Sequence, residues 1–168
     1  GAFTGASQAQ AGKFEQAQDG SLLLDEVTEM PMSLQAKLLR VLQEREVERV
    51  GGKKPVPLNI RIIATSNRDM AEAVAKGVFR EDLFYRLNVF PVAIPALRQR
   101  REDIPAIARH FVVEHGGRLG RLGVSLTPAA EALLLAHQWP GNVRELENAI
   151  QRALILSTGP NIGPEHFN

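Results

Sequence analysis

The sequence predicts an α/β core followed by a small helical subdomain. Two apolar segments, at residues 21–27 and 58–65, each run into polar residues, as strands of a parallel sheet do at their carboxyl ends. An amphipathic segment at residues 31–44 lies between them and completes the strand, helix, strand order of an α/β unit. From Asp103 onward the pattern is helical. We therefore expect the core within residues 1–98 and the helical subdomain within 99–168.

Local patterns place the elements of the core in order. The first strand, SLLLDEV, is a continuous apolar block of the kind that is buried on both faces of a sheet. Residues 46–57, with a glycine pair and two prolines, predict a hairpin or an exposed loop insertion. The expected helices cover residues 13–17, 31–44, 69–76 and 80–88, and the expected strands cover residues 21–27, 58–65 and 89–94.

The helical subdomain is predicted from start and stop signals. Helices are expected at residues 104–114, 127–137 and 142–156, with a glycine-rich break at residues 116–123. Thr127 followed by Pro128 is a typical helix start. Asn142 and Glu145 have the spacing of a capping box at the start of the last helix.

Composition excludes several classes of function. The chain has no cysteine, and its four histidines are scattered without metal-ligand spacing, so neither disulfides nor a zinc site are expected. No apolar run approaches the roughly 20 residues of a membrane span, and no leader sequence opens the chain. A net charge of +1 gives no general attraction to nucleic acid. We expect a cytoplasmic protein without membrane contact.

Asp25 and Glu26 follow the first apolar block and form a strong chemical signal. A carboxylate at the end of a buried strand faces the ligand crevice of an α/β sheet, where it can hold magnesium through oxygen. A neighbouring glutamate can polarise an attacking water. The alternative is a pair of ordinary acids at the start of the next helix.

The second apolar strand ends at Thr65 and is followed by Ser66 and Asn67. An amide at this place can hydrogen-bond a phosphate or position a water, since it both donates and accepts. The alternative is an asparagine that only forms a turn.

Three arginines are candidates for contact with phosphate. Arg80 and Arg86 lie six residues apart in FREDLFYRLNV, so they do not share one helix face. The alternative for Arg80 is a surface ion pair with Glu81 or Asp82. Arg144 lies in WPGNVREL, where the tryptophan is expected in the core, and its alternative is a plain surface position.

The chain opens on GAFTGA, a glycine-hinged segment with one aromatic ring and one hydroxyl. Its glycines are too permissive to hold a regular element, which predicts an exposed loop or a disordered terminus. The six residues of this opening segment are Gly1, Ala2, Phe3, Thr4, Gly5 and Ala6.

Together these motifs resemble the central AAA+ ATPase domain of the bacterial enhancer-binding proteins, the activators of sigma-54 RNA polymerase. GAFTGA, LLLDE, the glycine-pair insertion, TSNRD, FREDLFYRLNV, PALRQRREDI and WPGNVREL occur in the order of that family. The resemblance implies a parallel-sheet AAA+ core, incomplete at its N-terminus, followed by an α-helical lid.

The resemblance also implies roles for the candidate residues. Asp25 would hold Mg²⁺ and Glu26 would activate water, as in a Walker B motif. Ser66 and Asn67 would sense the nucleotide. Arg80 and Arg86 would reach the ATP of an adjacent subunit, and Arg144 would act from the lid. The opening loop would contact sigma-54.

The same resemblance implies partners and leaves a gap. The family binds ATP, forms rings that are usually hexameric, contacts the sigma-54 RNA polymerase holoenzyme, and binds DNA through a separate domain; some members belong to two-component systems. No GxxxxGK[ST] phosphate loop occurs in these residues. We therefore expect the chain alone to neither bind ATP well nor hydrolyse it. The alternatives are a catalytically silent interaction or oligomerisation module and a different AAA+ remodeller.

Overall fold

The structure is a computed structural model that describes residues 12–52 and 54–167 of the 168-residue chain. It consists of two compact units, one ending at Val92 and the other beginning at Ala93. We call them the core unit and the helical unit, and each is described by itself. The opening GAFTGA segment lies outside the described residues.

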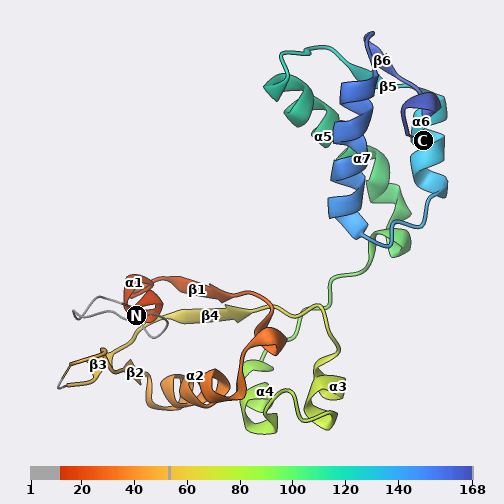
Figure 1. Ribbon diagram of the computed structural model, residues 1–168. Coiled ribbons are helices and arrows are strands. Elements are labelled where there is room, and N and C mark those ends of the chain that lie inside the picture. Colours follow the sequence, from red (N-terminus) through yellow and green to blue (C-terminus); the bar gives the residue numbers. More distant parts are fainter. Residues whose placement is uncertain (1–11, 53, 168) are drawn as a thin grey trace. The chain divides into compact units, whose positions relative to one another are not determined.

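The core unit has the parallel α/β architecture that the sequence predicts (Figure 1). Strands β1 and β4 pair in parallel, with Leu22 opposite Ile62 and Leu24 opposite Ala64. A second, antiparallel pair, β2 with β3, forms the predicted hairpin. The helices are α1 (Lys13–Gln16), α2 (Met32–Glu44), α3 (Met70–Ala75) and α4 (Glu81–Leu87), and the strands are β1 (Ser21–Leu24), β2 (Glu46–Val47), β3 (Val56–Pro57) and β4 (Arg61–Ala64). A 3-10 turn, η1 (Val27–Glu29), follows β1.

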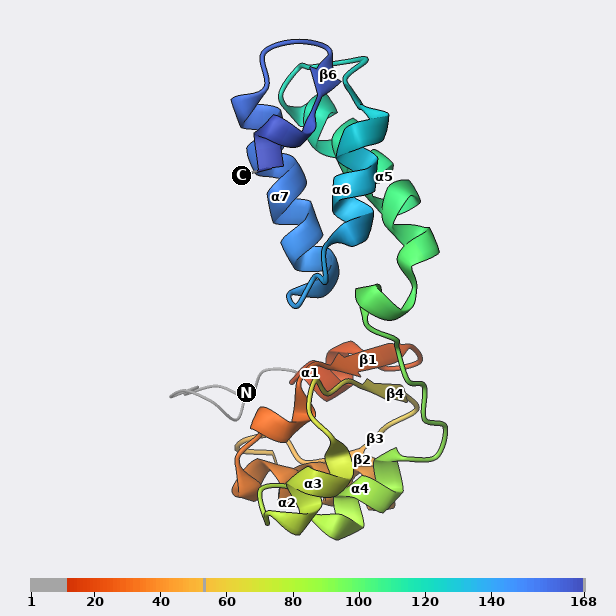
Figure 2. The same ribbon diagram turned by 90° about the vertical axis from the view of Figure 1, so that its right-hand side faces the viewer.

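Helices α2, α3 and α4 lie on one face of the β1–β4 sheet in both views (Figures 1 and 2). Their apolar side chains, among them Leu38 and Leu83, form one cluster with Phe79 from the segment between α3 and α4, and Leu24 packs against it. On the opposite face, Leu23 and Ile63 are 59% and 46% exposed. The expectation that the first strand is buried on both faces is therefore wrong, because the described helices cover only one face.

No strand forms at residues 89–94, where the sequence predicted a third one. Val89, Phe90 and Ile94 are more than four-fifths exposed, at 82%, 86% and 81%. This expectation is wrong for a physical reason. An apolar run becomes a strand only when a neighbouring strand satisfies its backbone, and among the described residues none pairs with this segment.

The helical unit packs three long helices around one apolar cluster. Helices α5 and α7 share the largest contact, and the cluster includes Ile104, Trp139, Leu146 and Ile150, each at most 3% exposed. A short parallel pair, β5 with β6, closes the unit. Its elements are η2 (Leu97–Gln99), η3 (Arg101–Asp103), α5 (Ile104–Arg118), β5 (Ser125–Leu126), α6 (Pro128–Ala136), α7 (Asn142–Leu156), β6 (Asn161–Ile162) and η4 (Pro164–Phe167).

Two local expectations for this unit need correction. Helix α5 continues through Gly116 to Arg118 instead of ending at residue 114. A glycine suits position 116 because the chain that follows the helix returns close to it, and an added Cβ would meet the carbonyl oxygen of Arg121 at 3.0 Å. The glycine therefore serves packing and does not break the helix.

The second correction concerns the start of α7. Its N-cap is Gly141 and not Asn142, and the Gly141 N–H donates to Glu145 Oε2 at 3.1 Å, so Glu145 caps a different residue and the predicted capping box does not form. The Asn142 side chain instead accepts a hydrogen bond from the backbone N–H of Leu97 at 2.9 Å. Asn142 thus ties η2 to α7. At α6 the prediction is confirmed, because the Thr127 hydroxyl accepts from the N–H of Ala130 at 3.1 Å.

Among the described helices, none combines the length and the hydropathy needed to cross a bilayer.

Candidate functional site

The two acids Asp25 and Glu26 lie where β1 ends, and both are exposed. Because β1 and β4 are parallel and in register, the residues that follow β4 lie at the same edge of the sheet. Thr65, the first residue after β4, donates its hydroxyl proton to Asp25 Oδ1 at 2.5 Å. The same hydroxyl oxygen accepts from the N–H of Glu26 at 3.1 Å. The structure therefore brings the acid pair and the end of β4 into direct contact.

The polar turn after β4 continues this contact. The hydroxyls of Ser66 and Thr28 lie 3.4 Å apart, and Arg68 forms a 2.6 Å ion pair with Glu29. Asn67 is exposed, and its side chain has no hydrogen-bond partner among the described residues. Of the two sensor candidates, Ser66 is thus held in the turn, since its hydroxyl also bonds both backbone groups of Arg68 at 3.1 Å. The amide of Asn67 is open to a ligand.

Arg80 lies just before α4 and is its N-cap residue. Its guanidinium forms a two-point pair with Asp82, at 2.9 and 2.8 Å. This side-chain hydrogen bond lowers the pKa of Asp82 and raises the pKa of Arg80. In the structure Arg80 therefore makes the ion pair that the sequence left as an alternative to a phosphate contact. A phosphate with two free oxygens could take the place of the Asp82 carboxylate on the same fork.

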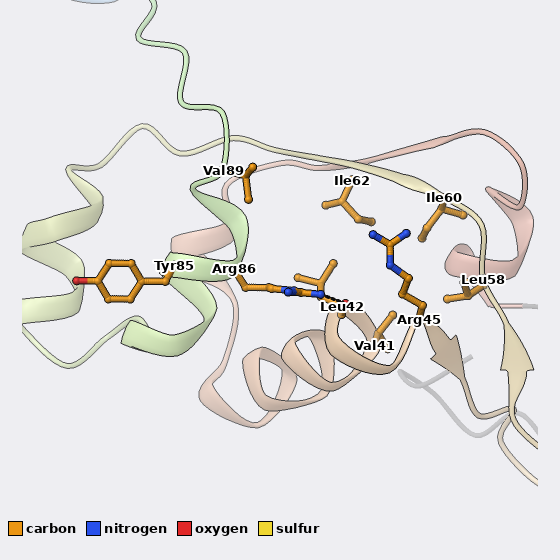
Figure 3. A pocket seen from close by; sticks show the side chains of 9 residues that line it. All are labelled: Val41, Leu42, Arg45, Leu58, Ile60, Ile62, Tyr85, Arg86 and Val89. Atoms are coloured by element: carbon orange, nitrogen blue, oxygen red, sulfur yellow. Dashed lines mark hydrogen bonds between the residues drawn. The ribbon is translucent and has the colours of Figure 1, made fainter.

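Arg86 lies in the last turn of α4 and has a different partner from Arg80. It donates to the carbonyl oxygen of Leu42 at 3.0 Å, near the end of α2 where carbonyl groups lack helical partners. Arg86 lines a cavity of about 330 Å³. Figure 3 shows that Arg45, which also lines it, extends from the end of α2 toward Ile60 and Ile62. No described hydrogen bond or ion pair joins Arg80 or Arg86 to the acid pair.

Arg144 is exposed on the first turn of α7, in the helical unit, and its side chain forms no hydrogen bond or ion pair with the described residues. The turn before it is rigidly built. Trp139 is 3% exposed and donates from Nε1 to the carbonyl of Leu134 at 2.8 Å, so its predicted place in the core is confirmed. At Gly141 an added Cβ would lie 2.7 Å from the Cβ of Glu145. These contacts fix the position of Arg144 at the start of α7.

Sequence reasoning singled out neither Thr65 nor Gln35. Gln35 is fully buried, and its amide donates to the carbonyls of Met30 and Val78 at 2.8 and 2.9 Å. Its oxygen accepts from the N–H of Arg80 at 2.9 Å, so it fixes the start of α4. A signal was available for Gln35, because it lies three and four residues before two buried leucines on the same helix face.

Comparison with known families covers nearly the whole chain. Residues 1–93 match the sigma-54 interaction domain, and residues 98–168 match an AAA+ ATPase lid domain.

Curated relatives are similar over almost all of this chain. It is 59% identical over 164 residues to the response regulator protein FleR of Pseudomonas aeruginosa PAO1, covering 98% of this chain and 35% of FleR. It is 53% identical over 165 residues to the regulatory protein AtoC of Escherichia coli K12, covering 98% of this chain and 36% of AtoC. The chain thus spans about a third of the length of these relatives.

Solved structures share the fold. The chain superposes on NtrX from Brucella abortus in complex with ADP with a TM-score of 0.86 and 42% identity, covering 94% of this chain and 37% of NtrX. The complex of NtrX with ATP gives the same TM-score and identity over 94% of this chain and 38% of that one. With a family match over more than half of its residues, the chain belongs to the sigma-54 interaction domain family, and an AAA+ lid domain follows in the same chain.

Proposed function

We propose that this chain is the part of a sigma-54-dependent transcription activator that hydrolyses ATP and couples hydrolysis to remodelling of the sigma-54 RNA polymerase closed complex. One observation supports the proposal most strongly. The parallel register of β1 and β4 places the acid pair Asp25 and Glu26 in contact with the polar turn that leads to Asn67. Open α/β sheets bind their ligands at this edge.

The residues present fit a magnesium ion bound together with ATP. Asp25 has one carboxylate oxygen bonded to Thr65, and hydroxyls of Thr28 and Ser66 lie on the adjoining turns. Among the described residues no three histidine or acidic side chains gather into a metal cluster. A single carboxylate is the usual protein ligand when Mg²⁺ takes its other ligands from phosphates and water, where it neutralises phosphate charge. Asp25 is accordingly the residue that holds it.

Each remaining candidate residue has its own role in this proposal. Glu26 polarises the attacking water, and the open amide of Asn67 donates to the terminal phosphate. Arg80 and Arg86 act on the ATP of a neighbouring subunit in a ring. Their guanidinium groups stabilise charge on the transferring phosphoryl group, which raises the rate of hydrolysis by about 10³ to 10⁵-fold. Arg144 is the lid arginine that acts on the terminal phosphate of ATP. NtrX, a relative of similar fold, is known in complexes with ATP and with ADP.

The phosphate cradle is not among these residues, since their sequence contains no GxxxxGK[ST] loop. We propose that hydrolysis needs this loop from the intact protein, and that the 168-residue chain alone is catalytically silent. Magnesium-dependent ATP hydrolysis by the purified chain would contradict this part of the proposal.

The sigma-54 contact is tested with the opening loop. In the intact protein, Phe3→Ala and Thr4→Ala are expected to leave ATP hydrolysis within about twofold of wild type, because neither residue belongs to the hydrolytic site. Transcription from a sigma-54 promoter, measured in a reconstituted assay, is expected to be lost. Variants that still activate this promoter as well as wild type would overturn the assignment of the loop.

A further inference from the structure

Thr65 is hydrogen-bonded to four consecutive residues, from Leu24 to Val27. Its backbone N–H donates to the carbonyl of Leu24 at 2.9 Å, and its own carbonyl accepts from the N–H of Val27 at 2.9 Å. Its hydroxyl bonds the two residues between them, Asp25 and Glu26. Thr65, a single residue just after β4, therefore holds the whole turn that carries the acid pair.

Only the hydroxyl bonds depend on the identity of the side chain. Any residue at position 65 except proline would supply the two backbone bonds, whereas the bonds to Asp25 and Glu26 need an alcohol. The direction of these bonds is also fixed. The hydroxyl has one proton, which goes to the Asp25 carboxylate, and its oxygen accepts from the Glu26 N–H. The result is a directed chain from the backbone of Glu26 through Thr65 to Asp25.

This chain of hydrogen bonds sustains an unfavourable backbone conformation. Glu26 has a φ of 52°, in the left-handed region that residues other than glycine rarely occupy. Such a conformation persists only where surrounding contacts hold it. Here the N–H groups of Glu26 and of the following Val27 are both bonded to Thr65. The direction in which the Glu26 side chain leaves the main chain is thus set by Thr65.

We propose that Thr65 is a positioning residue for the acid pair. Its hydroxyl keeps one oxygen of Asp25 occupied and leaves the other for the metal. The same hydroxyl holds Glu26 in the left-handed conformation from which it faces the attacking water. This inference rests on the proposed function. A phosphate that meets Asn67 and displaces the turn after β4 would thereby move both acids, because Thr65 connects this turn to them.

The first test measures amide hydrogen exchange by NMR in the 168-residue chain. Thr65→Val removes the hydroxyl and keeps the branched shape, so exchange at the Glu26 N–H is expected to accelerate about tenfold or more, the effect of one lost hydrogen bond. The Val27 N–H, which is bonded to the Thr65 carbonyl, is expected to keep its rate. Thr65→Ser is expected to restore slow exchange at Glu26.

Two outcomes of this measurement would overturn the inference. One is an unchanged exchange rate at Glu26 in Thr65→Val. The other is equal acceleration at Glu26 and Val27, because the side chain would then hold the turn in general and not the acids in particular.

The second test measures ATP hydrolysis by the intact protein. Thr65→Val is expected to lower kcat by about 10 to 100-fold, the usual effect of removing a group that orients a metal ligand, with KM for ATP nearly unchanged. Thr65→Ser is expected to recover most of kcat. Thr127→Val, which removes a hydroxyl from the N-cap of α6, is the matched control and is expected to hydrolyse ATP as wild type does.

Asp25→Asn and Glu26→Gln separate the two proposals. If both variants hydrolyse ATP normally, the proposed function itself fails. If they are inactive while Thr65→Val has a wild-type kcat, the site stands and only the role of Thr65 is refuted.

Discussion

Replacing Gln35 by leucine is expected to destabilise the core unit by about 3 kcal/mol. The Gln35 side chain is fully buried and satisfies three backbone groups: the carbonyls of Met30 and Val78 and the N–H of Arg80. A leucine has a similar volume but no polar atom, so all three groups lose their partner. Each such loss costs about 1 kcal/mol or more, which gives the total.

The two units allow a selective assay. The only tryptophan of the chain, Trp139, is in the helical unit, so its fluorescence follows unfolding of that unit alone. Far-ultraviolet circular dichroism follows both units. In urea, Gln35→Leu is expected to lower the midpoint of the core transition and to leave the fluorescence midpoint in place.

A matched control comes from the same helix. Gln43 is exposed on α2, so Gln43→Leu is expected to change the free energy of unfolding by no more than about 0.5 kcal/mol. The reasoning would be refuted if Gln35→Leu cost less than about 1 kcal/mol, or if it shifted the Trp139 fluorescence as much as the dichroism.

Three further predictions concern single contacts. Gly141→Ala is expected to cost the helical unit about 1 to 3 kcal/mol, because the new Cβ would lie 2.7 Å from the Cβ of Glu145; a fluorescence midpoint like that of wild type would contradict this. Thr127→Ala is expected to cost the same unit about 1 kcal/mol through loss of the N-cap bond, measured in the same way, and a neutral effect would show that the cap contributes nothing. Hydrogen bonding from Arg80 lowers the pKa of Asp82, so this pair stabilises the folded core above about pH 4, the unfolded pKa, and the contribution is lost as pH falls through the lower folded pKa. Asp82→Asn is therefore expected to unfold more readily than wild type near neutral pH and equally at low pH, and a difference that grows on acidification would contradict the sign.

Much of the fold could be predicted because its signals are local. The bounds of α7 follow from a continuous apolar stripe, and the start of α6 follows from the Thr127 cap, which the structure confirms. The parallel order of β1 and β4 followed from two apolar blocks separated by a helix. These patterns need no knowledge of distant residues.

The errors arose where the outcome depends on distant partners. The apolar run at residues 89–94 has the composition of a strand, but the described residues offer it no strand to pair with. Asn142 has the spacing of a cap, yet it bonds Leu97, which lies 45 residues away in the sequence.

The candidate site shows the same division between local signals and contacts with distant residues. The acids and the polar turn could be named as candidates because each follows an apolar strand. Thr65 looked only like the end of a strand, since its bonds reach residues about 40 positions earlier in the chain. The pairing of Arg80 with Asp82 was open from sequence alone, because a nearby acid and a phosphate satisfy the same guanidinium fork.

The most direct test of the account is the ATP hydrolysis rate of the intact protein carrying Glu26→Gln, measured at saturating ATP together with ATP binding. An amide cannot accept the proton of the attacking water, so hydrolysis is expected to fall by about 10² to 10⁴-fold while ATP still binds. A hydrolysis rate close to that of wild type would show that the acid turn after β1 is not where ATP is cleaved.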